Sequence, residues 1–162
     1  MSPKWSIFAP SLSSIQPKVK LELSTEKARY SLGEQVKGQI KIASEEQLEV
    51  NQLVVQLKCD ENIKKMRMVG NQYSTYQTEY WDGACIYNAV CRVLQLSLLP
   101  VGFSGVYPFS LDVSSAAKET LYSIDHNVRW HLFGVMETKG RPNTVTPVYE
   151  VQITRPQASQ TG

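Results

Sequence analysis

The sequence predicts an all-β protein whose strands form two antiparallel sheets packed as a sandwich. Apolar and polar residues alternate along residues 18–24, 35–43 and 51–60, so each segment can bury one face and expose the other. Five further segments with partial alternation follow, and turn-forming residues separate them. Only residues 114–122 have a helix-like composition. We therefore expect about eight strands and at most one short helix.

The first three strands have the clearest inward faces. The alternation assigns their inward positions to Val19, Leu21 and Leu23, then Val36, Gly38, Ile40 and Ile42, then Leu53, Val55, Leu57 and Cys59. The residues between them are mostly lysine, glutamate and glutamine, which favour water. Gly38 stands in the apolar register, and a glycine inside a strand allows another part of the backbone to approach closely.

A hairpin is expected next, because Asp82–Gly83 is a favoured tight-turn pair between two strand-like segments, 76–81 and 84–98. The alternation loses its register near residues 91–93, which indicates a bulge. Residues 114–122 are expected to form either one or two helical turns capped by a serine or a loop. The last three strands are expected at residues 107–111, 128–132 and 149–153.

The length and composition are those of a single globular domain. The chain has 162 residues, of which 42% are hydrophobic and 20% charged. We expect a flexible N-terminal extension at residues 1–17, the sandwich at residues 18–154 and a flexible polar tail at residues 155–162. The charges nearly balance, with 17 Lys and Arg against 15 Asp and Glu, so nucleic-acid binding is not predicted.

The cysteines and the N-terminus favour a cytoplasmic location. Three cysteines without a CxxC spacing predict neither a disulfide framework nor a zinc site. Residues 1–17 lack the continuous apolar run of a signal peptide, and no apolar run is long enough to span a membrane. Association with a membrane is therefore expected only through a partner.

The sequence contains no set of residues that predicts catalysis. The stretch Ser123, Asp125 and His126 contains the residue types of a catalytic triad, but neighbours on one loop rarely converge, and a turn is the expected structure. No metal-ligand spacing and no phosphate-binding glycine loop occurs, so no metal and no cofactor are predicted. Cys59 follows an inward face and is expected to be an inert thiol. We expect a protein that is not an enzyme.

Four segments resemble, in order, the N-terminal domain of the arrestin family. Residues 30–40, Tyr-Ser-Leu-Gly-Glu-Gln-Val-Lys-Gly-Gln-Ile, are similar to the family pattern Tyr-x-Pro-Gly-Glu-x-Val-x-Gly-x-Val, with Leu32 in place of the usual proline. Residues 53–57, the passage from Leu96 to Leu111, and residues 127–132 resemble later strands. The resemblance implies an immunoglobulin-like sandwich of the arrestin N-domain type.

The resemblance covers only the first half of a typical arrestin-fold protein. Visual arrestins, α-arrestins, the arrestin-like subunit of retromer and bacterial sporulation-control proteins generally have two such sandwiches. We therefore expect either a natural single-domain relative or one half of a longer protein. The resemblance implies a non-catalytic adaptor or scaffold that binds a protein partner, with roles in transport or signalling.

The segment 62–81 is the candidate partner-binding region. It is expected to be a loop between two strands, and the corresponding loop of the resembled family engages partners. Its candidate contact residues are Lys64, Lys65, Arg67, Tyr73 and Tyr76. Alternatively, the tyrosines pack across a hairpin and the cations form a solvated face.

Two lysines at the start of the first strand, Lys18 and Lys20, are further candidates. Basic residues near this position contact phosphate in receptor-binding arrestins, but lysines on an edge strand also prevent unwanted pairing. An open sheet edge could bind an extended segment of a partner or pair with a second copy as a homodimer.

The alternative function is a ligand- or carbohydrate-binding sandwich of the immunoglobulin-like type. In that case Tyr80, Trp81 and Tyr87 would form a stacking platform for the ligand. Such a protein would more naturally be secreted, which the three unpaired cysteines argue against.

Overall fold

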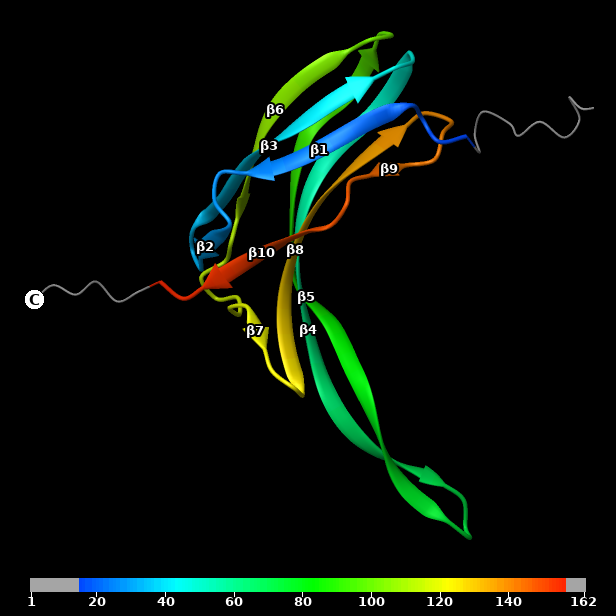
Figure 1. The fold of residues 1–162 in the computed structure, drawn as a ribbon, viewed down its shortest axis with the longest axis vertical. Helices are drawn as coiled ribbons and strands as arrows, with labels where there is room; N and C mark the ends of the chain where they lie inside the picture. The colour runs from blue at the N-terminus through cyan, green and yellow to red at the C-terminus, as the bar shows by residue number, and fades with distance from the viewer. Residues whose placement is uncertain (1–14, 157–162) are drawn as a thin grey trace, which may run out of the picture.

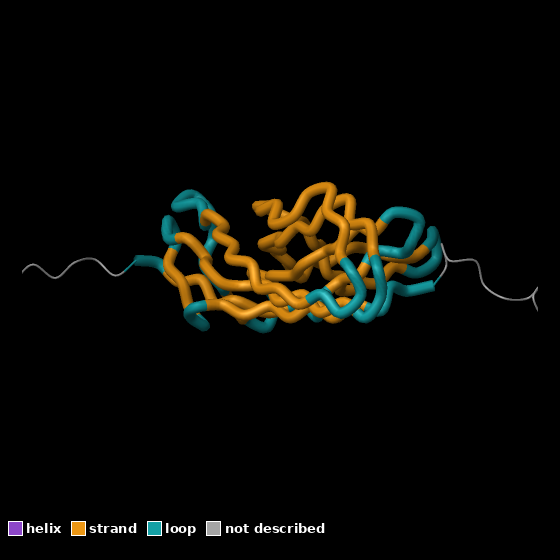
Figure 2. The backbone as a smooth tube through the Cα atoms, turned by 90° about the horizontal axis from the view of Figure 1, so that it is seen from above, coloured by secondary structure: helices purple, strands orange, loops and turns teal. Residues whose placement is uncertain are grey.

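The computed structural model describes residues 15–156 and folds them into strands and connecting loops, with no helix among them (Figures 1 and 2). The fold class predicted from the sequence is therefore confirmed. The described residues form ten strands: β1 (Val19–Thr25), β2 (Arg29–Ser31), β3 (Gln35–Ser44), β4 (Leu48–Gly70), β5 (Thr75–Leu99), β6 (Ser104–Asp112), β7 (Leu121–Tyr122), β8 (His126–Thr138), β9 (Thr144–Val145) and β10 (Tyr149–Thr154).

The strands form two sheets with different widths. The smaller sheet has the order β1-β3-β6, and the larger has the order β2-β10-β8-β4-β5, with the short strands β7 and β9 also paired to β8. All neighbours run antiparallel except β2 and β10, which are parallel. The sheets therefore face each other as the two layers of a sandwich.

The core lies between the inward faces that the alternation predicted. Trp130 is fully buried, and its indole Nε1 donates a hydrogen bond of 2.9 Å to the carbonyl of Lys118, so its one polar atom is paired. Burial of each large apolar side chain stabilises the fold by about 1.5–3 kcal/mol. The fully buried residues from both sheets include Val36, Ile40, Ile42, Leu53, Val55, Leu57, Cys59, Leu132, Met136, Val151 and Ile153.

Two glycines occupy positions where a side chain would cause strain or a clash. Gly33 has φ +86° in the turn between β2 and β3, a conformation that other residues adopt only with strain. Gly38 lies where β3 meets β1 and β6, and a Cβ atom there would stand 2.0 Å from the carbonyl oxygen of Ser24. The close approach of the backbones therefore requires glycine at position 38.

The hairpin predicted at Asp82–Gly83 is wrong. These residues lie inside β5, opposite Ile63 and Asn62 of β4, and the turn comes about ten residues earlier, after Gly70. The side-chain Oδ1 of Asn71 accepts hydrogen bonds from the amides of Tyr73 (2.8 Å) and Ser74 (3.1 Å), and the Asn71 amide donates to the Ser74 carbonyl. This asparagine turn reverses the chain, so the segment 62–81 is a β-ribbon and not a loop.

The bulge predicted near residues 91–93 is confirmed. Leu53 pairs with Leu94 and Val54 pairs with Arg92, which leaves Val93 as an extra residue in β5. The segment 114–122 forms no helix. Ser114 starts a turn, to which the amides of Ala116 and Ala117 bond, and Leu121–Tyr122 forms β7.

Most of the predicted terminal extensions, residues 1–17 and 155–162, lie outside the described residues. Within the described part, Arg141 donates hydrogen bonds to the carbonyls of Ile15 (2.9 Å) and Gln16 (3.3 Å), and Pro17 is buried. Residues 15–17 are therefore fixed against the loop that follows β8. No helix within residues 15–156 has the length and apolar character needed to cross a membrane.

Candidate functional site: the projecting β4–β5 arm

The two longest strands continue past the end of the sandwich as a projecting ribbon (Figure 1). β8 pairs with β4 only as far as the partners His126 and Ile63. From the pair Lys64 and Trp81 outward to the turn, β4 and β5 pair only with each other among the described residues. We call residues 64–81 the arm. An isolated two-stranded ribbon is at best marginally stable in water. A projecting ribbon of this length is therefore our candidate for contact with another molecule.

The register gives the arm two faces of different character. Side chains alternate along each strand, and directly paired residues lie on the same face. The inner face continues the face that carries buried Cys59 and consists of Lys65, Arg67, Val69, Tyr76, Thr78 and Tyr80. The outer face consists of Lys64, Met66, Met68, Gln77, Glu79 and Trp81.

The cations of the arm are held by diagonal contacts on their own faces. Lys64 pairs with Glu79 across the outer face, at 2.7 Å. On the inner face Lys65 pairs with Asp82 at 2.7 Å, and this hydrogen bond raises the pKa of Lys65. The Arg67 guanidinium lies over the ring of Tyr80, 5.3 Å from its centre. Such exposed ion pairs stabilise a protein little, so these cations can exchange partners readily.

Large apolar side chains of the arm remain in water. The exposed fractions are 53% for Met66, 61% for Met68, 49% for Trp81, 59% for Tyr76 and 86% for Tyr73. Methionine and aromatic residues are enriched where proteins bind each other, because they bury much area and adapt to a partner. The arm therefore has the composition of a contact surface.

A mostly buried carboxylate fixes the base of the arm to the sandwich. Glu61, whose side chain is 12% exposed, accepts hydrogen bonds through Oε2 from Lys118 Nζ at 2.6 Å and meets His126 Nε2 at 2.8 Å. These two contacts, the lysine first, lower the pKa of Glu61. The Asn62 amide donates to the Asn127 side chain at 3.0 Å. Sequence reasoning missed this cluster, because only the β4–β8 register brings residues 61 and 126 together.

The structure places the predicted contact residues in two separate regions. Lys64, Lys65, Arg67, Tyr73 and Tyr76 all lie on the arm or its turn. By contrast, Lys18 directly precedes β1 and Lys20 lies at its start, in the smaller sheet, at the opposite end of the molecule from the arm (Figure 1). Lys20 pairs with Glu22 on the same exposed strand at 2.9 Å, and the Lys18 amide donates to Glu46.

The predicted stacking platform of Tyr80, Trp81 and Tyr87 is wrong. Tyr80 and Trp81 are neighbours in one strand and therefore point to opposite faces of the arm. Tyr87 lies beside Trp130, with ring centres 5.4 Å apart, and its hydroxyl donates to the carbonyl of Asp112. The three rings share no surface on which a sugar could stack.

The turn predicted at residues 123–126 is confirmed. The Ser123 hydroxyl donates to the His126 carbonyl at 2.7 Å, and the Ser123 amide donates to the same oxygen. The imidazole of His126 contacts Glu61 instead of the serine hydroxyl. Within residues 15–156, no three His, Cys, Asp or Glu side chains are grouped in a way that could hold a metal ion.

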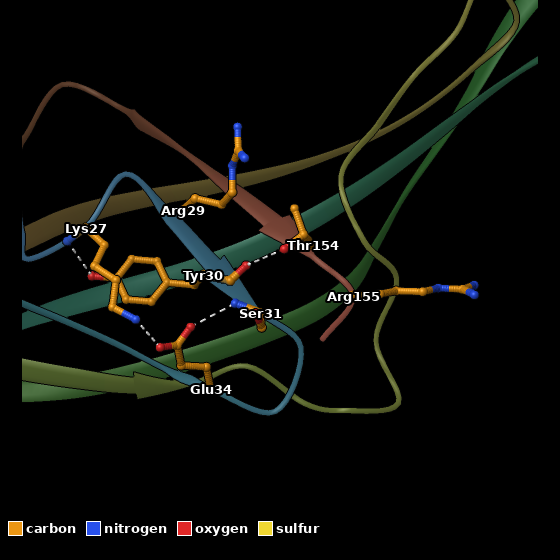
Figure 3. A pocket seen from close by; sticks show the side chains of 7 residues that line it. All are labelled: Lys27, Arg29, Tyr30, Ser31, Glu34, Thr154 and Arg155. Atoms are coloured by element: carbon orange, nitrogen blue, oxygen red, sulfur yellow. Dashed lines mark hydrogen bonds and ion pairs between the residues drawn. The ribbon is translucent and has the colours of Figure 1, made fainter. Parts of the chain in front are cut away.

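An open hollow beside β2 and β10 carries three cations but does not gather them at one point (Figure 3). Lys27 pairs with Glu34, and Arg29 donates to Gln152 at 3.1 Å. Arg155 lies 3.3 Å from a carboxylate oxygen of Glu119, and its side chain points away from that of Arg29. Because each cation faces a separate neighbour, the hollow is not built to hold an anion, and the arm remains the better candidate.

Comparison with known proteins identifies the fold but not a family. No family model matches the sequence, and no curated protein matches it. The structure is similar to that of Spo0M, a sporulation control protein from Bacillus subtilis, with a TM-score of 0.60, 14% sequence identity and 88% of this chain covered. The match covers 51% of the Spo0M chain, so this chain spans about half the length of that protein. The fold is therefore an arrestin-like β-sandwich.

Proposed function

We propose that this protein is a non-catalytic adaptor that binds a protein partner through the β4–β5 arm. The observation that carries the proposal is the projection of a ribbon beyond the last β4–β8 pair with methionine and aromatic side chains in water. The sandwich supports this role as a rigid base, because Glu61 fixes the arm to Lys118 and His126 at its foot. The three free cysteines fit a reducing, cytoplasmic location.

The aromatic and methionine side chains near the end of the arm would contribute most of the binding free energy with a partner. Tyr73 is held at the tip by the asparagine turn, with its backbone amide bonded to Asn71, so little backbone freedom is lost on binding. Tyr76 and Met68 lie on opposite faces of the ribbon beside it. A partner that covers the tip therefore contacts both faces, as expected for a projection that enters a groove.

The test uses the full chain as bait in an extract of the cells that make it. The arm variant carries Met68→Ser, Tyr73→Ser and Tyr76→Ser, at positions so exposed that we expect an unchanged melting temperature. We expect this variant to lose most of the partner that the wild type recovers, because interface anchors of this kind each contribute more than about 1 kcal/mol.

The matched control carries the same kind of change at three exposed apolar residues of the sandwich, Val101→Ser, Val106→Ser and Val148→Ser. We expect the control to recover the same partner as the wild type. Equal recovery of each protein by the wild type, the arm variant and the control would refute a role for the arm.

A further inference from the structure

The β4 edge of the arm has unpaired main-chain groups, because β8 pairs with β4 only as far as His126. The amide of Lys64 donates to the carbonyl of Asp125 at 2.7 Å, on the side of β4 away from β5. Main-chain groups alternate sides along a strand, so the amides and carbonyls of Met66 and Met68 point the same way. Beyond His126 no described strand lies there to receive them. We call this open edge of residues 65–69 the β4 lane.

The side chains along the β4 lane alternate between charge and apolar surface. Lys65 and Arg67 lie on the inner face, two residues apart, while Met66 and Met68 lie on the outer face between and beside them. A strand added to the lane would set its own residues alternately against these two rows, with opposite Cβ atoms about 4.5–5.5 Å apart. Acidic side chains would then face Lys65 and Arg67, and apolar ones would face the methionines.

The other edge of the arm has the opposite charge. Between Thr75 and Cys85, β5 carries Glu79 and Asp82 and no cation. The two edges therefore select different sequences, and a single partner strand with acidic residues fits only the β4 side. The same charges disfavour a symmetric dimer through the arm, because pairing two β4 edges brings lysine and arginine rows together and pairing two β5 edges brings acids together.

We propose that the β4 lane binds an extended segment of a protein partner in which acidic residues alternate with apolar ones, adding a strand to the arm. This inference rests on the proposed function and names the chemistry of the partner. Main-chain bonds to Met66 and Met68 supply part of the affinity, and the alternation of charge supplies selectivity. Arg67, which contacts the Tyr80 ring and no carboxylate in the described structure, is the cation most ready to pair with the partner.

The first test compares two peptides of identical composition with the full chain. The alternating peptide is Thr-Glu-Val-Glu-Val-Glu-Thr, and the blocked isomer is Thr-Glu-Glu-Glu-Val-Val-Thr. We expect the alternating peptide to bind at least about tenfold more tightly, because only it can place acids and valines on opposite faces. It should also slow hydrogen exchange at the amides of Met66 and Met68, and binding should weaken as salt rises.

The second test exchanges the charges. The variant Lys65→Glu, Arg67→Glu should lose the acidic peptide and bind Thr-Lys-Val-Lys-Val-Lys-Thr instead. A further variant, Met68→Pro, removes one amide of the lane but leaves both cations, and it should weaken binding at least about tenfold. Hydrogen exchange at the amide of Tyr80, which faces β4 farther down the arm, checks that each variant keeps the ribbon paired.

Three results would overturn the inference. These are equal affinity for the alternating and blocked peptides, protection at Gln77 and Glu79 of β5 instead of at Met66 and Met68, and no binding at millimolar peptide. If any of these results is found and the Met68, Tyr73 and Tyr76 serine variant still loses the partner, strand addition is refuted but the proposed function is not. Capture that is independent of the arm would refute both.

Discussion

Replacing Glu61 with glutamine should loosen the base of the arm. The carboxylate is mostly buried and receives Lys118 at 2.6 Å and His126 at 2.8 Å. A hydrogen bond between charged groups contributes about 1.5–3 kcal/mol, but Lys118 is largely exposed and regains water when the carboxylate is lost. We therefore expect Glu61→Gln to lower the free energy of unfolding by about 1–2 kcal/mol, and the melting temperature by about 3–8 °C.

The effect should depend on pH with a definite sign. Lys118 and His126 hold the pKa of Glu61 in the folded protein below its ordinary value of 4.5. A carboxyl whose folded pKa is depressed stabilises the protein above its unfolded pKa, and this contribution disappears as pH falls through the folded pKa. The difference in the free energy of unfolding between the wild type and Glu61→Gln should be largest at pH 7 and should vanish at acidic pH below the folded pKa of Glu61.

Urea unfolding at pH 7 and at acidic pH measures both expectations, and hydrogen exchange along the arm reports the local loosening. The matched control is Glu22→Gln, because Glu22 also has a lysine partner, Lys20 at 2.9 Å, but both of these side chains are more than half exposed. We expect the control to change stability by less than about 0.5 kcal/mol. An equal effect of the two substitutions, or a Glu61 effect that does not decrease as the pH is lowered, would refute the anchoring role.

Three further outcomes follow from local geometry. Gly38→Ala should destabilise the protein by about 3 kcal/mol in urea unfolding, because the new Cβ would lie 2.0 Å from a backbone oxygen. Gly83→Ala should have the smaller effect, because its Cβ would clash with a side-chain atom, which can move. The reverse order of the two effects would contradict this packing. Burial raises the pKa of Cys59 to about 12, so a thiol reagent at pH 8 should label exposed Cys85 and leave Cys59 unmodified until the protein unfolds. Mass spectrometry of the digested protein would show which cysteine carries the label. Asn71→Ala removes the acceptor of two turn amides and should speed hydrogen exchange at the arm tip with global stability unchanged; a lowered melting temperature would show that the arm unfolds together with the sandwich.

Local patterns were enough to predict the sandwich and much of its core. The alternation in residues 35–43 and 51–60 places Ile40, Leu57 and Cys59 inward, and all three are fully buried. This succeeds because the two-residue period of a strand is a property of neighbouring residues and needs no knowledge of distant ones. The same period, applied to Tyr80 and Trp81, already excludes a shared stacking face.

The arm required the tertiary structure. The sequence contains two competing turn signals, Asp82–Gly83 and the Asn71 turn. The Asn71 turn forms because it lets residues 75–81 pair with residues 64–70 of β4. A turn at residue 82 would have left residues 64–70 without a partner strand. The cluster of Glu61 and His126 likewise depends on where β8 joins β4. Alternation along one strand determines which side chains can be buried, but only the register between strands far apart in the chain determines where the sheet ends and which edge stays open.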